Sequence, residues 1–468
     1  IFTILGAAAA GETPHNLVDW IWSGAVTSSS AVVNAKVKSS ADVTLLLSEY
    51  NDLSSPTTIG PLAANSGNNN TVSFDLSSLT ADRRYHYAIQ IGGQVDGQHR
   101  GTFRTFPAGA FSFAFAISGD AEQGSNLPVF DVVREEQTRF FVSPGDFMYS
   151  DIGVDNVNLY RSAFAETLSA SRQSELYRNM PIAYMWDDHD YATNNSDKYA
   201  DSRSSAREAY QEIVPHYPLG AVSAVALDRP DVAAFDNVPI YQSFTVGRAY
   251  FILTDLRSER DSGAGTMMGA VQKQWFKDEL EFARENLYTP IFWLSSVPWI
   301  AAADSGADHW AGFHAERVEI ANFIKANDIQ NVIILSADAH MIALDDGTNS
   351  DYATDGGAPL PVFQAAALDR GGSIKGGPYS HGAYQNDATY ISQYALVQVT
   401  DNGGDDVDVR YVGKRLTAAD TVRVLMSPNA VEAQVPLDWS TTLTVPQPTA
   451  VTLHNFSAAA ESTAVAPV

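Results

Sequence analysis

The stretch PIAYMWDDHD, Pro181–Asp190, joins an apolar run directly to a cluster of charges. Pro181–Trp186 has the composition of a strand that is buried on both faces, as in sheets covered by helices. Three carboxylates and one histidine follow it, in the order Asp-Asp-His-Asp at positions 187–190. Carboxylates this close repel one another unless a cation or a proton intervenes. The stretch therefore predicts an α/β fold with a functional site at the carboxyl end of this strand.

Three more predicted strands end in acidic residues, where the chain reads SGDAE (118–122), GDFMYSD (145–151) and SADAH (336–340). Taken alone, each has an ordinary explanation: Gly-Asp is often a turn, and a lone histidine such as His340 is more often structural. Together the clusters support one another, because the carboxyl ends of strands in an α/β sheet converge on one edge. We therefore expect their acids to meet in space.

From Phe111 onward, apolar strands alternate with segments of helical periodicity, which is typical of an α/β core. The predicted strands are Phe111–Ile117, Arg139–Ser143, Pro181–Trp186, Ile240–Val246, Ala249–Leu253, Pro290–Val297, Asn331–Ser336 and Leu360–Ala366. The predicted helices are Asn158–Met180, Ser202–Ile213, Ala270–Arg284 and Glu316–Asn327. Two more strands, Ser392–Val399 and Asp406–Val412, form a β extension, and the tail from Val445 is rich in small residues and proline.

The preceding part of the chain shows short alternating strands with turns about every ten residues, which is typical of an all-β sandwich. Its strands include Ala31–Val37, Val43–Leu47, Val72–Leu76, Tyr85–Ile91 and Gly101–Phe106. The segment from Leu79 to Pro107 resembles the end of a fibronectin type III domain. We expect two domains, a β-sandwich over residues 1–107 and a second domain over 108–468.

The composition excludes several classes of partner and site. With 29 Lys+Arg against 55 Asp+Glu, the net charge is −26, and residues 1–106 contribute little of it. Such a chain repels nucleic-acid and anionic membrane phosphates, so we expect no nucleic-acid-binding surface. The absence of cysteine excludes disulfides and thiolate metal sites. No apolar run reaches the roughly 18 residues of a transmembrane helix, and Ile4–Ala10 fits either the tail of a signal peptide or the entry into a strand.

The ligand types at the strand ends favour hard cations. Carboxylate oxygens with one tyrosine and one or two histidines suit Ca²⁺, Mg²⁺, Mn²⁺ or ferric iron better than soft metals. A phenolate from Tyr149 would favour ferric iron in particular. Because the carboxylates outnumber what one ion needs, the pattern is compatible with two neighbouring metals.

Five motifs follow one another in a specific order: GDxxYxD (145–151), WDDHD (186–190), DxR (255–257), DxWxGFxxER (308–317) and SxDxH (336–340). Together they resemble the PhoD-like alkaline phosphatase family, part of the metallophosphoesterases and related to the purple acid phosphatases. The resemblance covers about residues 110–420. It implies a metallophosphoesterase-type two-sheet core flanked by helices (α/β/β/α), preceded by the fibronectin III-like sandwich, with 108–468 as the catalytic domain.

The resemblance also implies roles for single residues. The implied metal ligands are Asp120, Asp146 as the bridging carboxylate, Tyr149, Asp187, Asp188 where relatives use Asn, Asp338 and His340. A metal-bound hydroxide would attack phosphorus in line while His189 protonates the leaving oxygen. The implied metals are Fe³⁺ and Ca²⁺, with Mn²⁺, Mg²⁺ or Zn²⁺ as alternatives. The expected substrate is a small phosphate ester, either a monoester or a diester, and the expected location is secreted or periplasmic.

Three departures from the family pattern concern the metal more than the reaction. No cysteine ligand is present near the first motif, Glu122 stands where many metallophosphoesterases have histidine, and Ser295-Ser296 replace a further histidine. Arg257 and Arg161 are candidates to bind substrate phosphate, although each is more typical of a structural ion pair.

Two other functions would use some of the same features. A calcium-binding extracellular adhesin or polysaccharide-binding protein would explain the β-sandwich and the acidic clusters, but it leaves His189 and His340 without a role. A glycoside hydrolase could use two acids near Trp186 or Trp299, and that chemistry needs no metal.

Overall fold

A computed structural model of the chain describes residues 15–220, 238–417 and 438–446. Its largest sheet contains nine strands in the spatial order β21 (Asp438–Pro446), β20 (Asp406–Thr417), β19 (Tyr390–Thr400), β9 (Phe113–Ile117), β10 (Phe141–Ser143), β11 (Ile182–Tyr184), β1 (Val18–Gly24), β2 (Ala31–Val37) and β5 (Thr71–Leu76). Strands β9, β10 and β11 run parallel. Their carboxyl ends therefore lie along one edge of the sheet, as the sequence pattern predicts.

A second sheet of seven strands holds the later half of the core. Its order is β12 (Gln242–Val246), β13 (Ala249–Leu253), β14 (Ile291–Leu294), β15 (Val332–Ser336), β17 (Val362–Ala365), β16 (Met341–Asp345) and β18 (Ala383–Gln385). Strands β13, β14, β15 and β17 are parallel neighbours. Every residue of β13, β14 and β15 is buried, which explains their unbroken apolar sequences.

Aromatic side chains join the two large sheets face to face. The ring of Phe115 on β9 lies edge-on to Phe251 on β13 at 5.5 Å and to Phe292 on β14 at 5.4 Å. Phe140, just before β10, packs edge-on against Phe251 at 5.6 Å. Edge-to-face ring pairs at these distances are a favoured packing mode, so these residues make the centre of the core.

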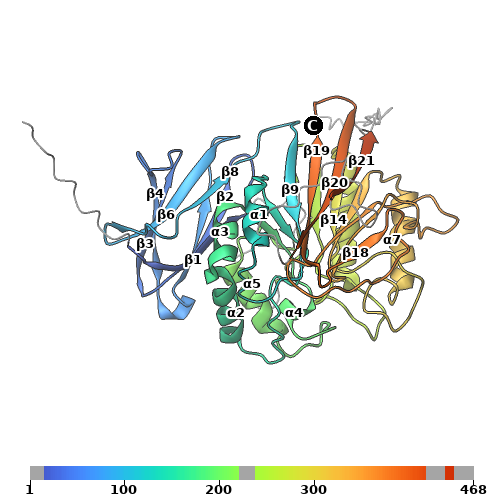
Figure 1. Cartoon of the computed structure of the whole chain (residues 1–468), viewed down its shortest axis with the longest axis horizontal. Helices are drawn as coiled ribbons and strands as arrows, with labels where there is room; N and C mark the ends of the chain where they lie inside the picture. The colour runs from blue at the N-terminus through green and yellow to red at the C-terminus, as the bar shows by residue number, and fades with distance from the viewer. Residues whose placement is uncertain (1–14, 221–237, 418–437, 447–468) are drawn as a thin grey trace, which may run out of the picture.

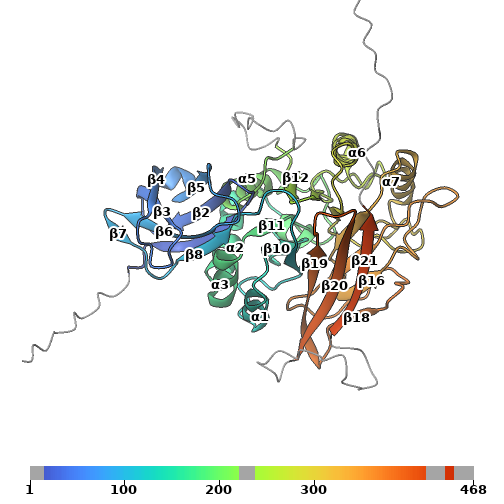
Figure 2. The same cartoon turned by 90° about the horizontal axis from the view of Figure 1, so that it is seen from above.

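Helices cover the outer faces of both sheets. Those on the side of the first sheet are α1 (Val129–Glu135), α2 (Val157–Ser169), α3 (Ser171–Asn179), the single turn α4 (Asp188–Tyr191) and α5 (Arg203–Ile213). The second sheet is covered by α6 (Gly269–Glu285) and α7 (His314–Ala326), which lie far from the N-terminal strands (Figure 2). The predicted α/β core is thereby confirmed. Within the described ranges, no helix combines the length and apolarity that crossing a bilayer requires.

The N-terminal strands form a β-sandwich region at one end of the molecule (Figure 1). Its second sheet contains β4 (Thr57–Ala64), β3 (Ala41–Ser48), β6 (Arg84–Ile91) and β7 (Gln94–Val95), with β8 (Gly101–Arg104) also paired to β6 and a short 3₁₀ turn at Ser66–Asn68. Strands β1, β2 and β5, however, belong to the nine-stranded sheet, and β1 meets β11 where Gly24 pairs with Ile182. The division at residue 107 stays a prediction, because one sheet runs across it.

Two sequence predictions differ from the observed helices. The single helix predicted over Asn158–Met180 is wrong, because Ala170 has an extended backbone and separates α2 from α3. Asn126 from a distant loop accepts hydrogen bonds from Ser171 Oγ (3.1 Å) and Arg172 N (3.0 Å), and so caps the start of α3. Helices α1 and α4 and strands β16 and β18 were not predicted. Segment Ile4–Ala10 and the tail beyond residue 446 lie outside the described residues.

Candidate metal centre

Three of the predicted acids sit on left-handed backbone at the ends of strands. The φ angles are +59° at Asp120 after β9, +48° at Asp146 after β10 and +62° at Asp338 after β15. Aspartate tolerates this conformation better than most residues because its short side chain can hydrogen-bond locally. Unusual backbone of this kind persists where the surrounding structure holds it, and it is concentrated at functional sites.

The first two of these turns are locked together through their backbones. Asp120 N donates to Gly145 O (3.3 Å), and Ala121 N donates to Asp146 O (2.9 Å). A Cβ atom at Gly145 would lie only 2.5 Å from Cβ of Asp187, so no other residue fits there without displacement. The glycine thus brings the Asp146 turn into contact with the Asp187 segment.

A first group of ligand atoms combines Asp146, Asp188 and His189, all within 4.8 Å of one another. Asp146 is buried, and burial raises the pKa of its carboxyl well above the ordinary range, with Asp188 and Asp120 adding to the effect. Such mutual repulsion is the electrostatic condition that a bound cation relieves.

A second group contains Asp187, Asp188 and Asp338, again with ligand atoms within 4.8 Å of one another. Burial raises the pKa of Asp338 to about 7, even though the Lys375 ammonium lies 2.7 Å from its Oδ1. Asp338 Oδ2 is buried and has no hydrogen-bond partner among the described residues. Asp188 belongs to both groups, so its carboxylate connects them.

Asp120, Tyr149 and His340 make a third cluster beside the other two. The Tyr149 hydroxyl donates to Asp120 Oδ1 (3.1 Å) and lies 2.9 Å from His340 Nε2, which is 3.0 Å from the same carboxylate oxygen. Burial lowers the pKa of His340, but the Asp120 carboxylate outweighs it and holds the pKa above its ordinary value. Burial and Asp120 also raise the pKa of Tyr149. The second oxygen of Asp120 is buried without a hydrogen-bond partner in the described part of the chain.

Asp187 differs from the other acids because an arginine already occupies it. Arg257 Nε and Nη2 each lie 2.7 Å from one Asp187 oxygen, and Ser296 Oγ donates to Oδ1 at 2.6 Å. Arg257 is fully buried and also pairs with Asp308 at 2.9 Å. The interpretation of Arg257 as an ion-pair partner is therefore confirmed. Asp187, predicted as a ligand, has both oxygens engaged by protein donors.

His189 lies at the accessible side of the cluster. Its side chain is 19% exposed, and its Nδ1 is 2.7 Å from Asp151 Oδ1. The Tyr149 ring stacks on the imidazole with a centroid distance of 4.2 Å. A carboxylate on one ring nitrogen fixes the orientation of the ring.

The structure brings all eight predicted site residues into one region, but sequence reasoning missed Lys375. This lysine lies in the glycine-flanked run GGSIKGG (371–377), which follows strand β17, and that position after a strand was the available signal. Glu122 pairs with Arg370, whose guanidinium lies 3.9 Å from the Tyr149 ring centroid. Arg161, the other candidate for binding substrate phosphate, pairs with Glu212 of α5, with Nε 2.9 Å from the carboxylate.

These residues fit a metal. Isolated buried carboxylate oxygens are costly unless they are hydrogen-bonded or coordinated, and Asp120 and Asp338 each present one such oxygen. The donor set of carboxylates, one phenol and imidazoles matches hard or borderline cations. The fold and the site together define the class of protein: an α/β protein with candidate metal-binding groups at the ends of its strands.

Comparison with known proteins gives the family. Residues 113–393 match the family model of the PhoD-like phosphatases, so the chain belongs to that family. Alkaline phosphatase D of Bacillus subtilis (strain 168) is 24% identical over 320 residues, which is 58% of this chain and 53% of that protein. The chain thus spans about half the length of this curated relative. The solved structure of PhoD aligns over 87% of this chain and 90% of that one, with a TM-score of 0.66 and 18% identity, and this likeness shows a shared fold.

Proposed function

We propose that this chain hydrolyses phosphate esters at the strand-end cluster, with the aid of metal ions. The proposed ligands are Asp120, Asp146, Tyr149, Asp188, Asp338 and His340. The observation that carries the proposal is the pair of buried carboxylate oxygens, at Asp120 and Asp338, that have no hydrogen-bond partner in the described part of the chain and lie next to further buried acids. The family membership and the likeness to an alkaline phosphatase D support phosphate esters as the substrate class.

Bound metals would act as Lewis acids, lowering the pKa of a water molecule and neutralising charge on the phosphoryl oxygens. The protein's own cations are mostly engaged at this site, because Arg257 is buried between Asp187 and Asp308. Lys375 is different: its side chain is 35% exposed while its ammonium lies beside Asp338. We assign Lys375 the role of contacting a substrate phosphate oxygen, as a flexible point charge.

His189 is the proposed general acid. Asp151 holds its Nδ1, which leaves Nε2 as the nitrogen able to pass a proton to the leaving oxygen of the ester. The stacked Tyr149 ring restrains the imidazole further. His189 also belongs to the first group of ligand atoms, so the competing assignment for this residue is metal binding.

For the metals we propose Fe³⁺ with Ca²⁺, and Mn²⁺, Mg²⁺ or Zn²⁺ as alternatives. The support is the Tyr149 phenol between a carboxylate and an imidazole, a donor suited to ferric iron. Elemental analysis together with a visible absorption scan tests this assignment. A charge-transfer band that disappears in Tyr149→Phe would support iron, whereas a colourless, iron-free active protein would contradict it.

Finer features of the family are also proposals. They are a metallophosphoesterase-type core, a fibronectin III-like character of the sandwich region, and a secreted or periplasmic location. Cell fractionation tests the location.

The calcium-binding adhesin is not favoured, because it gives no role to His189 and His340. Turnover of p-nitrophenyl phosphate and bis-p-nitrophenyl phosphate, with and without a chelator, separates the two functions.

The central test is Asp146→Asn, which keeps the shape of the side chain and removes its charge. We expect turnover to fall by at least about 100-fold, as for loss of a group that stabilises the transition state, and the metal content to fall with it. The matched control is Asp304→Asn, an exposed acid outside the cluster, which should leave both unchanged. Wild-type turnover in Asp146→Asn would refute the assignment of this carboxylate.

A second test concerns His189→Gln. If His189 protonates the leaving oxygen, the loss should be small for p-nitrophenyl phosphate, whose leaving group is a weak base, and larger for phenyl phosphate. The metal content should stay at the wild-type value. Equal losses for both esters, together with lost metal, would instead make His189 a ligand.

A further inference from the structure

A cavity of about 480 Å³ lies between the sandwich region and the α/β core, away from the strand-end cluster. It is lined on one side by β6 and β8 and on the other by α1, α3 and the segments that lead into β10 and β11. The lining residues that carry charge are Arg84, Arg104, Arg134, Arg139 and Glu175. Its size is that of a small-molecule site, for which about 300–1,000 Å³ is typical.

The charge of this cavity is opposite to that of the molecule. Four arginines and one glutamate line it, in a chain of net charge −26 that has only 29 lysines and arginines. The neighbouring acids do not balance it fully: Asp82 is shared by Arg104 (3.0 Å) and Arg139 (3.2 Å). Glu175 is likewise shared by Arg134 and Arg178, while Asp131 pairs with Arg134 and Arg172.

Two of these guanidinium groups also keep one N–H without an acceptor among the described residues, although each is paired with Asp82 through another nitrogen. Arg104 Nε and Arg139 Nη1 are buried and have no hydrogen-bond partner among the described residues. Arg84 is exposed, and its side chain makes no ion pair within the described part of the chain. Burial lowers the pKa of Arg139, and the positive charges of Arg104 and Arg84 add to this effect. Converging guanidinium groups with unmet donors favour a multiply charged oxyanion, which accepts planar paired hydrogen bonds.

The cavity is distinct from the candidate metal centre by topology. Arg139 and Pro181 precede β10 and β11, whereas the metal-centre acids follow the carboxyl ends of the same strands. The two sites therefore lie at opposite ends of the parallel strands β10 and β11. An anion in the cavity would contact both the sandwich region and the core.

We propose that this arginine-lined cavity binds a phosphate-type oxyanion, either free phosphate or the phosphate group of a small molecule, at the junction of the sandwich region and the α/β core. The proposal goes beyond ester hydrolysis, since it adds a second, non-catalytic anion site. A bound anion would neutralise the like charges of Arg84, Arg104 and Arg139 and stabilise the junction.

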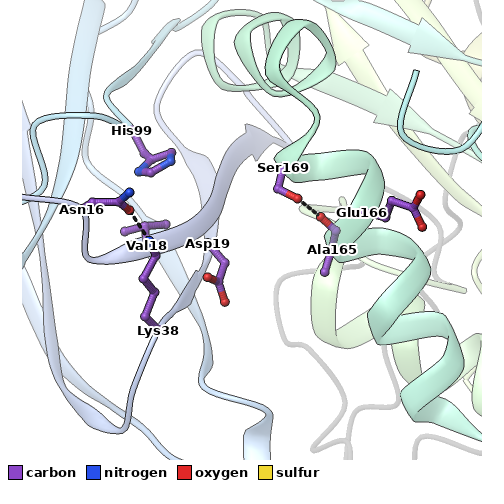
Figure 3. A pocket seen from close by; sticks show the side chains of 8 residues that line it. All are labelled: Asn16, Val18, Asp19, Lys38, His99, Ala165, Glu166 and Ser169. Carbon is purple, nitrogen blue, oxygen red and sulfur yellow. Dashed lines mark hydrogen bonds between the residues drawn. The ribbon is translucent and has the colours of Figure 1, made fainter. Parts of the chain in front are cut away.

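Another cavity serves as a contrast. It lies between the start of β1 and helix α2, and its lining includes the bases Lys38 and His99 and the acids Asp19 and Glu166 (Figure 3). With two acids and only one permanently charged base, Lys38, it favours no anion. Lys38 therefore offers a control, because Lys38→Gln removes one positive charge from a cavity outside the proposal.

The test is calorimetric titration of the metal-loaded enzyme with orthophosphate, and separately with phenylphosphonate, whose P–C bond an esterase does not cleave. The variants are Arg84→Gln, Arg104→Gln and the double variant, with Lys38→Gln as the control. Arg84 is exposed and unpaired among the described residues, so Arg84→Gln should fold normally, and Arg84→Lys keeps the charge. Turnover of p-nitrophenyl phosphate is measured in parallel.

We expect the wild type to bind more than one phosphate per chain, and the double variant to weaken one site by about tenfold or more. The values of kcat and KM should be unchanged, and Lys38→Gln should resemble the wild type.

Preference for phenylphosphonate at the arginine-dependent site would indicate that the ligand is the phosphate group of a small molecule. Preference for orthophosphate would indicate free phosphate. Arginine-independent binding of both ligands would overturn the proposal. An enzyme without ester turnover that still shows arginine-dependent phosphate binding would refute the proposed function but not this site.

Discussion

Arg257 and Asp308 show how single buried charges are stabilised beside the site. Arg257 contacts Asp187 at 2.7 Å and Asp308 at 2.9 Å, and Arg260 contacts Asp308 at 2.6 Å. The pKa of Arg257 is raised well above its usual value because the three nearby carboxylates Asp187, Asp188 and Asp308 outweigh its burial. This chain of alternating charges offsets desolvation, and it holds Asp187 in place next to the ligands.

The pH dependence of stability should reflect Asp308. Burial raises the pKa of this carboxyl, but Arg257 and Arg260 outweigh it and lower the pKa to about 2. Because the folded-state pKa lies below the unfolded value of about 3.9, Asp308 contributes stability that is complete above pH about 4 and is lost as the pH falls toward 2. We expect Asp308→Asn to lower the urea midpoint at pH 6, with the difference from wild type narrowing below pH about 4.

Urea titrations of both proteins at several pH values measure this difference. Asp304→Asn, which changes an exposed acid nearby, should leave the profile unchanged. A difference between Asp308→Asn and the wild type that grows toward low pH would contradict the assigned ion pairs.

At the scale of elements, the site is made by turns at the ends of parallel strands. The turns after β9 and β10 hydrogen-bond to each other through Asp120 N and Ala121 N, and Gly145 lets the second turn touch Asp187. Strands β9 and β10 alone would place their acids only approximately. The backbone contacts between turns set the final spacing of the carboxylates.

Gly145→Ala should disrupt this spacing. The φ of Gly145 is +128°, and an added Cβ would meet Asp187 Cβ at 2.5 Å, so both strain and overlap oppose the change. We expect a loss of at least about 1–3 kcal/mol in unfolding free energy, as for overpacked sites, with lower metal content. The control is Gly265→Ala, which has a φ of +70° but no heavy atom within 4 Å of the new Cβ. Similar behaviour of the two variants would show that contact with Asp187 is unimportant.

Helix boundaries illustrate what local sequence does not determine. The periodicity of residues 158–180 continues through Ala170, so a single helix was the natural prediction. At the break, Asn126, which lies more than 40 residues earlier, accepts hydrogen bonds from Ser171 and Arg172 at the start of α3. Strands β13 and β15, by contrast, agree closely with prediction, because a fully buried strand must be apolar at every position.

At the scale of the whole molecule, a net charge of −26 opposes the compact state through self-repulsion. Raising NaCl from about 0.1 M to about 1 M shortens the Debye length from about 10 Å to about 3 Å. We therefore expect the Tm at pH 7 to rise with salt, as measured by circular dichroism. Near pH 4.6, the calculated isoelectric point, the increase should vanish or reverse, because screening then weakens attractive pairs instead. A Tm at pH 7 that falls with salt would contradict this interpretation.

The sequence by itself determined the features that depend on neighbours along the chain. Buried strands, amphipathic helices and the acids at strand ends are local patterns. The ordered motifs indicated the PhoD-like phosphatase family, and the match of residues 113–393 to the model of that family confirms it. All eight predicted site residues proved to share one region. Six of them follow the parallel strands β9, β10 and β11 of one sheet, whose carboxyl ends lie together. Asp338 and His340 follow β15 of the other sheet, so the packing of the two sheets brings them to the same place.

Only the tertiary structure decided which charges meet across long separations in the chain. Arg257 donates to both oxygens of Asp187, and Lys375 donates to Asp338. Strands β1 and β21 belong to the same sheet although more than 400 residues separate them. These contacts depend on sheet order and on turns that pack backbone to backbone, which no local pattern encodes. Electrostatic energy depends on distance in space and on burial, and the fold alone sets both.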